Sequence, residues 1–127
     1  MGLGEAHYPG RVPIDAYGNG GFRFAGMSHR GSLLLVPSGV YGWPVTRFDQ
    51  VDMACLARVV DEAAAIEILL MGCGPEMRRP SASVRTGLAD LGISVEVMAT
   101  GPAARTFNVL LAEDRAIAAA LIAVDNP

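Results

Sequence analysis

The sequence has no lysine, and all of its basic residues are scattered arginines. The 127 residues include 10 arginines and carry a net charge of −3. Proteins that bind nucleic acid concentrate positive charge on one face or along one helix. Here only Arg78 and Arg79 are adjacent. We therefore expect no nucleic-acid partner.

Cysteine and metal-binding motifs are scarce as well. The two cysteines, Cys55 and Cys73, do not make a disulfide framework in a domain large enough to build its own core. The two histidines, His7 and His29, are not at metal-ligand spacing, and there is no C-x-x-C motif. The sequence also lacks a phosphate-binding GxxxxGK[ST] loop. It therefore predicts no metal site, no cofactor and a reducing bacterial cytoplasm.

Long apolar runs and targeting signals are missing too. The longest uninterrupted apolar run is Ala116 to Val124, far short of the ~20 residues that cross a bilayer as a helix. Residues 1–10 show no cationic start followed by an apolar stretch, so they do not resemble a secretory signal. We expect a cytoplasmic protein that does not span a membrane and that lies beside the inner membrane only through a partner.

Charged residues are fewer than usual, which predicts a covered surface. They make up 18% of the sequence, and apolar residues make up 51%, whereas about 25% charged residues is typical. A chain of this size has much surface for its volume. We therefore expect either a protein partner or a second copy, as in a homodimer, to cover apolar surface.

The centre of the chain contains two consecutive strand–loop–helix patterns. Ile66 to Met71 is a segment of strand length that is apolar except for Glu67, followed by the loop Gly72–Gly74 and a helix capped by Ser81 or Ser83. Ser94 to Ala99 repeats the design, and a helix follows from Thr100. Two such units predict parallel strands with a crevice at their carboxyl ends. In this arrangement Glu96 would lie in a central strand.

The remaining segments predict a meander, a first helix and one ambiguous element. Residues 1–10 are predicted to be a loose tail, and residues 11–45 an antiparallel meander with turns at 18–21 and 28–31. Asp49 is a candidate cap for a helix with an apolar stripe from Met53 to Ala63. Residues 116–124 fit one long helix by their spacing and alanine content, or a strand after a polar break.

Seven residues form the candidate ligand-binding site at the predicted crevice: Gly72, Cys73, Gly74, Thr100, Gly101, Arg105 and Asn108. Arg105 and Asn108 are three apart, so they share a helix face. Arg105 would meet a small anion, helped by the amides of Gly74 and Gly101 at the helix start. This site lacks an identifiable catalytic group, because no histidine is placed to act as a base for Cys73.

A structural interpretation of the same residues remains open. The glycines would simply allow tight turns, and Cys73 would pack without reacting. Arg105 would pair with Glu96 or with a carboxylate near the C-terminus. Asn108 would hold a neighbouring loop, because asparagine is a poor choice inside a helix unless its side chain has a partner.

The order of several motifs resembles the family of Mth-type domains of unknown function. The motifs are YGNGGFRF at 17–24, GSLLLVPSGVYGW at 31–43, ILLMGCG at 68–74 and VEVMATGPAARTFNVLLAEDR at 95–115. The resemblance covers residues 7 to 124. In the last motif, Phe107 stands where the family usually has tyrosine.

The resemblance implies an α/β fold of three layers with a mixed central sheet, in which residues 116–124 form a strand. We accordingly expect one domain over residues 11–127, with a mostly parallel sheet, the N-terminal meander and about three helices. The family includes the adipogenesis-associated Mth domain protein and a mitochondrial assembly factor of respiratory complex I, and it has no established enzymatic activity. The resemblance therefore favours a non-enzymatic protein-binding module that assists complex I assembly; the anion site is the alternative.

Overall fold

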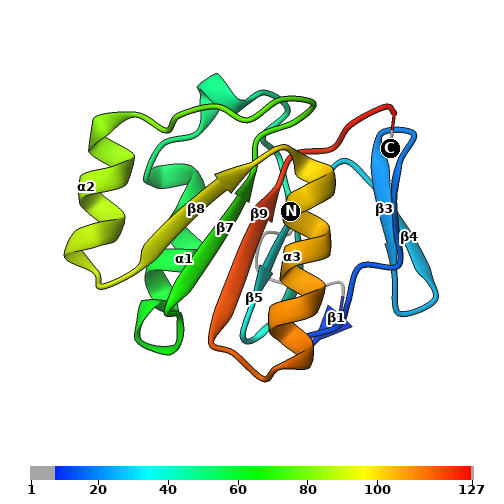
Figure 1. The fold of residues 1–127 in the computed structure, drawn as a ribbon, viewed down its shortest axis with the longest axis horizontal. Helices are drawn as coiled ribbons and strands as arrows, with labels where there is room; N and C mark the ends of the chain where they lie inside the picture. Colours follow the sequence, from blue (N-terminus) through cyan, green and yellow to red (C-terminus); the bar gives the residue numbers. More distant parts are fainter. Residues whose placement is uncertain (1–7, 127) are drawn as a thin grey trace.

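The computed structural model describes residues 8–126, which form three layers around a six-stranded sheet (Figure 1). The strands are β1 (Tyr8–Pro9), β2 (Ala16–Gly18), β3 (Gly21–Phe24), β4 (Met27–Arg30), β5 (Ser32–Val36), β6 (Gly39–Trp43), β7 (Ile68–Gly72), β8 (Ser94–Met98) and β9 (Ile117–Leu121). The helices are α1 (Ala57–Asp61), α2 (Ala82–Asp90) and α3 (Thr100–Ala112), with short 3₁₀ turns at Phe48–Gln50, Ala54–Leu56 and Ala63–Ala65.

The central sheet is mixed, with strand order β1-β6-β5-β9-β7-β8. Strand β7 pairs in parallel with both β8 and β9. The other three pairings are antiparallel, because β5 and β6 form a hairpin and β9 runs against β5. The predicted α/β fold with a mixed sheet is confirmed, but parallel pairing is confined to one side of the sheet. Strands β2, β3 and β4 form a separate antiparallel sheet.

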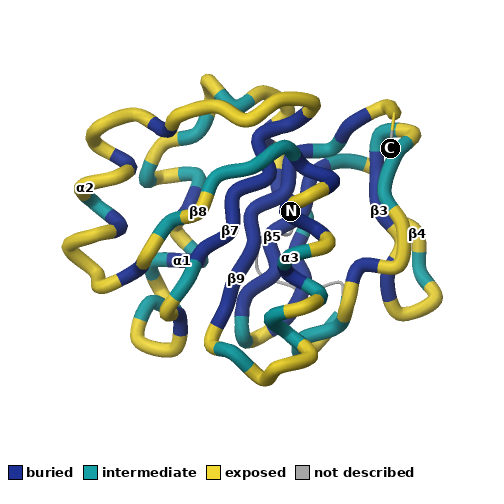
Figure 2. Tube along the Cα trace, viewed as in Figure 1, coloured by how far each residue is buried: buried dark blue, intermediate teal, exposed yellow. Residues whose placement is uncertain are grey.

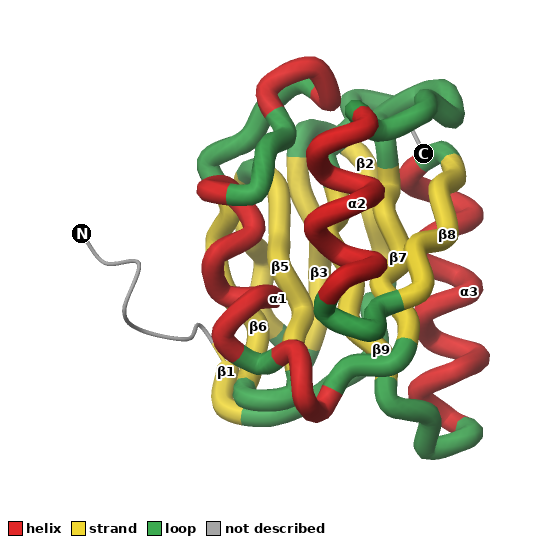
Figure 3. The backbone as a smooth tube through the Cα atoms, turned by 90° about the vertical axis from the view of Figure 1, so that its left-hand side faces the viewer, coloured by secondary structure: helices red, strands yellow, loops and turns green. Residues whose placement is uncertain are grey.

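Each face of the central sheet is covered by a different layer (Figure 3). Helices α1 and α2 lie on one face, while α3 and the small sheet lie on the other. Side chains along β7 alternate between two hydrophobic cores. Leu69 and Met71 lie in the core on the α1 and α2 side, and Leu70 lies in the core on the α3 side. Figure 2 shows the resulting buried band through β5, β9 and β7.

Residues Ile117–Leu121 form strand β9, as the family resemblance implies and against the helical spacing. Every residue of β9 is buried, because the strand lies in the middle of the sheet and both of its faces are covered. Asp114, with φ of 59°, reverses the chain after α3. Burial between two layers thus overrides the helix preference of the alanines.

Two expectations for the N-terminal region need correction. Of the predicted loose tail, residues 1–7 lie outside the described residues, and Tyr8–Pro9 pairs with β6 as strand β1. The predicted turn at 28–31 is largely strand, since Met27–Arg30 is β4. The chain turns earlier, at Ala25 and Gly26, which both have positive φ. An alanine in this conformation gives no turn signal in the sequence.

The predicted first helix is also shorter than expected. It is split into 3₁₀ turns and the five-residue helix α1. The predicted cap, Asp49, lies within the first 3₁₀ turn, and it is Asp52 that accepts a hydrogen bond from the amide of Cys55 at 2.9 Å. The apolar stripe correctly indicated the buried side of this segment, since Leu56 and Val59 are fully buried. It did not show that the segment is broken into short helical turns.

Strand β8 lies at an edge of the sheet rather than in its centre. The charged Glu96 is therefore exposed to solvent and needs no buried partner. Helix α2 begins as predicted, with Ser81 accepting a hydrogen bond from the amide of Val84, and Gly92 follows it with φ of 80°. Leu91, three residues after the fully buried Leu88, is 39% exposed because it follows the last turn of α2.

Candidate functional site

The structure brings the two glycine-containing loops together at the carboxyl ends of β7 and β8, which we call the rim (residues 72–74 and 100–102). The amide of Thr100 donates to the carbonyl of Gly74 at 2.8 Å. A Cβ atom on Gly72 would lie 3.0 Å from the Cα atom of Thr100. The predicted neighbourhood of these loops is therefore present, and Gly72 is needed for the close approach of α3 to β7.

Thr100 is fully buried and joins three segments at the rim. Its hydroxyl donates to the carbonyl of Ile122 at 2.6 Å and accepts from the amide of Gly74 at 3.0 Å. The amide of Cys73 donates to Met98 at 2.8 Å. The Gly74 amide that the sequence assigned to an anion is thus already hydrogen-bonded, because the chain leaving β9 crosses the rim and is tied there by Thr100.

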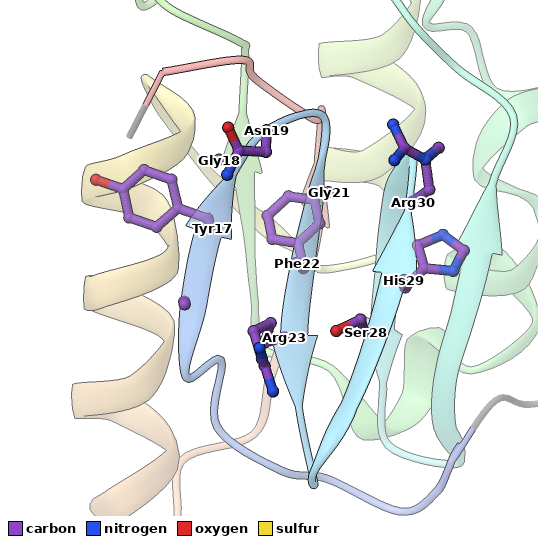
Figure 4. A pocket seen from close by; sticks show the side chains of 10 residues that line it. Tyr17, Gly18, Asn19, Gly21, Phe22, Arg23, Ser28, His29 and Arg30 are labelled. Atoms are coloured by element: carbon purple, nitrogen blue, oxygen red, sulfur yellow. The ribbon is translucent and has the colours of Figure 1, made fainter.

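Arg105 faces Tyr17 of the small sheet. Its Nη1 atom donates to the Tyr17 hydroxyl at 3.0 Å. Among the described residues Arg105 forms no ion pair with Glu96, one of the two carboxylate partners considered from the sequence. A side chain at Gly101 would collide with the Tyr17 hydroxyl. Figure 4 shows Tyr17 directed towards α3. Gly101 therefore permits the small sheet to approach the helix.

These residues line an open cavity of about 410 Å³. Its wall consists of Tyr17, Gly74, Pro75, Ala99, Gly101, Pro102, Arg105, Val124 and Asn126. Three predicted site residues contribute to it, whereas Gly72, Cys73, Thr100 and Asn108 do not. Tyr17 is not among the predicted site residues, because its contact with Arg105 spans 88 residues of chain.

Asn108 holds the segment that precedes β2. Its Oδ1 atom accepts from the amide of Ile14 at 2.8 Å, and its Nδ2 atom donates to the carbonyl of Ile14 at 2.8 Å. Both halves of the side-chain amide are therefore used by one backbone residue. This arrangement matches the structural interpretation, in which Asn108 ties a neighbouring loop to α3.

We expect Asn108→Asp to lower the free energy of unfolding by about 1–3 kcal/mol, because a carboxylate cannot donate to Ile14 and would face its carbonyl oxygen. Urea unfolding at neutral pH measures the change. Arg105→Gln on the same helix is the control, since Arg105 is exposed, and it is expected to change stability by less than about 1 kcal/mol. Equal stability of Asn108→Asp and the wild type would contradict the structural role.

Cys73 is buried at the end of β7 and is a poor nucleophile. Its sulfur lies 3.5 Å from the carbonyl of Arg78, and burial raises the pKa of the thiol above its usual value. The other thiol, Cys55, is less buried, although burial and a hydrogen bond with Asp52 also raise its pKa. Both cysteines therefore remain protonated thiols at neutral pH.

We expect iodoacetamide at pH 8 to alkylate Cys73 roughly tenfold more slowly than Cys55, because access and ionisation both require the thiol to leave the core. Mass spectrometry of the two peptides over time gives the rates. In urea the rates should converge. Faster labelling of folded Cys73 than of folded Cys55 would contradict this description.

The raised folded-state pKa of Cys73 also makes stability depend on pH. Its contribution to stability is present below the unfolded pKa and is lost as the pH rises above about 9.

A second hollow of about 410 Å³ lies on the small sheet (Figure 4). It is lined by Ala16, Tyr17, Gly18, Asn19, Gly21, Phe22, Arg23, Ser28, His29 and Arg30. The ring of His29 is 3.2 Å from the carbonyl oxygen of Ser32.

Within residues 8–126, no group of three or more potential metal ligands comes together. Across the same residues, no helix combines the length and apolar character needed to cross a membrane.

The chain is similar in sequence to uncharacterised proteins and to proteins named as assembly factors. The family model described as Protein of unknown function (DUF498/DUF598) matches residues 14–122. An uncharacterised protein of Rhodobacter capsulatus is 40% identical over 93% of this chain and 90% of its own length. NADH dehydrogenase [ubiquinone] 1 alpha subcomplex assembly factor 3 of Mus musculus is 32% identical over 96% of this chain, which spans 66% of that protein.

Solved structures share the fold over nearly the whole chain. A Bartonella henselae protein described as an outer membrane protein is 55% identical, with a TM-score of 0.90 over 94% of this chain and 100% of its own. A Bordetella pertussis protein described as a Mth938-like domain is 25% identical, with a TM-score of 0.79 over 99% of this chain and 95% of its own. These findings confirm the resemblance stated from the sequence motifs.

Proposed function

The chain belongs to the protein family described as Protein of unknown function (DUF498/DUF598), and from this kinship we propose that it is a non-enzymatic protein-binding module that assists assembly of respiratory complex I. The observation that carries the proposal is the 32% identity with a mammalian complex I assembly factor across 96% of this chain. The matched part spans 66% of that relative. The proposal therefore assigns the binding role to the shared domain.

The arrangement of the rim supports a binding role over catalysis. The Thr100 hydroxyl accepts from the Gly74 amide and donates to the Ile122 carbonyl, and both halves of the Asn108 side-chain amide bond to Ile14. The raised pKa of Cys73 keeps the thiol protonated. The polar groups of the predicted site thus serve the fold, and a surface that binds protein requires no reacting group.

The decisive experiment removes the gene from the source organism and measures assembled NADH dehydrogenase on native gels. We expect fewer fully assembled complexes and an accumulation of partial assemblies, with recovery when the wild-type chain is supplied. Cell fractionation tests the further proposal that the protein is cytoplasmic and lies beside the inner membrane through its partner. Recovery of the protein with the outer membrane would contradict that location.

Affinity capture from the same cells then tests direct contact. The tagged chain should recover NADH dehydrogenase subunits, and excess untagged chain should compete them away. Unchanged levels of assembled complex in the deletion strain, together with no competed respiratory subunit, would contradict the proposal.

A small anionic ligand is the second candidate, favoured by the exposed Arg105 in the cavity beside Tyr17. The guanidinium can donate to a carboxylate or phosphate while the cavity admits a small molecule. A thermal-shift screen with inorganic phosphate, nucleotides and carboxylates tests it. Arg105→Ala should abolish any stabilisation, and equal stabilisation of the variant would remove this candidate.

A further inference from the structure

Strand β8 is an open edge of the central sheet. Its only strand neighbour within residues 8–126 is β7. The amide of Ser94 donates to the carbonyl of Glu67 at 2.9 Å, and the carbonyl of Met98 accepts from the amide of Cys73 at 2.8 Å. In a parallel pair, the residues that bond to one neighbour alternate along the strand. Ser94, Glu96 and Met98 therefore use their backbone groups towards β7.

The intervening residues, Val95 and Val97, direct their amides and carbonyls away from the sheet. Such a row of backbone donors and acceptors is a template for one more strand. The valine side chains pack against the core on the α2 side. Glu96 points to the opposite face and is exposed. An added strand would thus meet apolar side chains on one face and a carboxylate on the other.

A second copy of this chain is a poor occupant of the edge. In an antiparallel pair of two β8 strands, Val95 and Val97 of each copy can bond to each other only when Glu96 lies opposite Glu96, which is repulsive. If the symmetry axis instead passes through Val95, Val95 pairs with itself and Val97 pairs with Ile93. If the axis passes through Val97, Val97 pairs with itself and Val95 pairs with Ala99. The amide of Ile93 already donates to Leu88, and the carbonyl of Ala99 already accepts from Ala103.

We infer that the β8 edge binds an extended segment of a partner protein, with apolar residues beside Val95 and Val97 and a lysine or arginine opposite Glu96. This inference rests on the proposed function as a protein-binding module and specifies its surface and the form of its partner. Backbone hydrogen bonds to the valines supply binding, and the charge opposite Glu96 selects among strands.

The test uses the full chain, labelled for amide NMR, and two capped peptides, Thr-Val-Lys-Val-Thr and Thr-Val-Glu-Val-Thr, at up to millimolar concentration. The lysine peptide should shift the amides of Val95 and Val97 and slow their hydrogen exchange. The glutamate peptide should bind about tenfold more weakly, because like charges then lie opposite each other. Glu96→Arg should reverse the preference. Asp61→Arg, an equal charge change at an exposed position on α1, should leave it unchanged.

Three results would overturn the inference. One is that neither peptide affects Val95 and Val97; another is that Glu96→Arg leaves the preference between the peptides unchanged. The third is a wild-type dimer in sedimentation whose Val95 and Val97 amides are already protected, which would make a second copy the occupant. If affinity capture recovers respiratory subunits while the peptides fail, the assembly role stands without this surface. If the peptides bind as expected but gene deletion leaves the assembled complex unchanged, the β8 binding surface stands without the assembly role.

Discussion

Replacing Thr100 with valine is expected to lower the free energy of unfolding by about 2–4 kcal/mol, although the two side chains have nearly the same shape. The loss arises from two partners that remain buried without hydrogen bonds. The Thr100 hydroxyl donates to Ile122 at 2.6 Å and accepts from Gly74 at 3.0 Å, and the residue is fully buried. Valine supplies neither bond, and both Gly74 and Ile122 are buried in the folded chain.

Urea unfolding followed by circular dichroism measures this loss, and Thr100→Ser is the matched control. Serine keeps the hydroxyl and removes one methyl group, so its expected loss is about 1 kcal/mol. In the valine variant, faster hydrogen exchange at the Gly74 amide should accompany the loss. A valine variant as stable as the serine variant would show that the rim does not depend on this hydroxyl.

Replacing Phe107 with alanine should lower the free energy of unfolding by about 3–5 kcal/mol. Phe107 is fully buried between α3, the central sheet and the small sheet. Its removal would leave a cavity at the point where the α3-side layer meets the sheet, and the surrounding strands can collapse into it only in part. Chemical unfolding of the variant and the wild type gives the difference.

Val109→Ala is the control for this prediction, because Val109 is on the same helix and is 57% exposed. Its expected effect is within about 0.5 kcal/mol. Phe107→Tyr tests the residue that the family usually carries here. A hydroxyl buried without a partner would cost about 1–3 kcal/mol. Similar stability of the alanine variants at positions 107 and 109 would contradict the packing described for α3.

The sequence was informative where a local pattern and its burial agree. The strand–loop–helix pattern located β7, β8 and the start of α3, and Ser81 was a predicted cap of α2. The repeated strand–loop–helix pattern also predicted that residues 72–74 and 100–102 meet at one rim. Short-range preferences sufficed here because hydrophobic periodicity and capping act within one or two turns of chain.

Sequence pattern failed where a distant contact decides the outcome. The alanines of β9 favour helix locally, and only their burial between two layers makes a strand. Arg105 bonds to Tyr17, and Asn108 bonds to Ile14, across 88 and 94 residues respectively. The spacing of residues within α3 does not predict which distant residues Arg105 and Asn108 contact.

By itself, the sequence determined the α/β class, the family and the pair of loops at the rim, because these follow from local patterns and shared motifs. Only the tertiary structure decided that the amides of Cys73, Gly74 and Thr100 are already hydrogen-bonded and that β8 is an edge. Strand order depends on which layers cover which faces, and this is settled by the packing of the whole chain. The open backbone groups of Val95 and Val97 follow from that order alone.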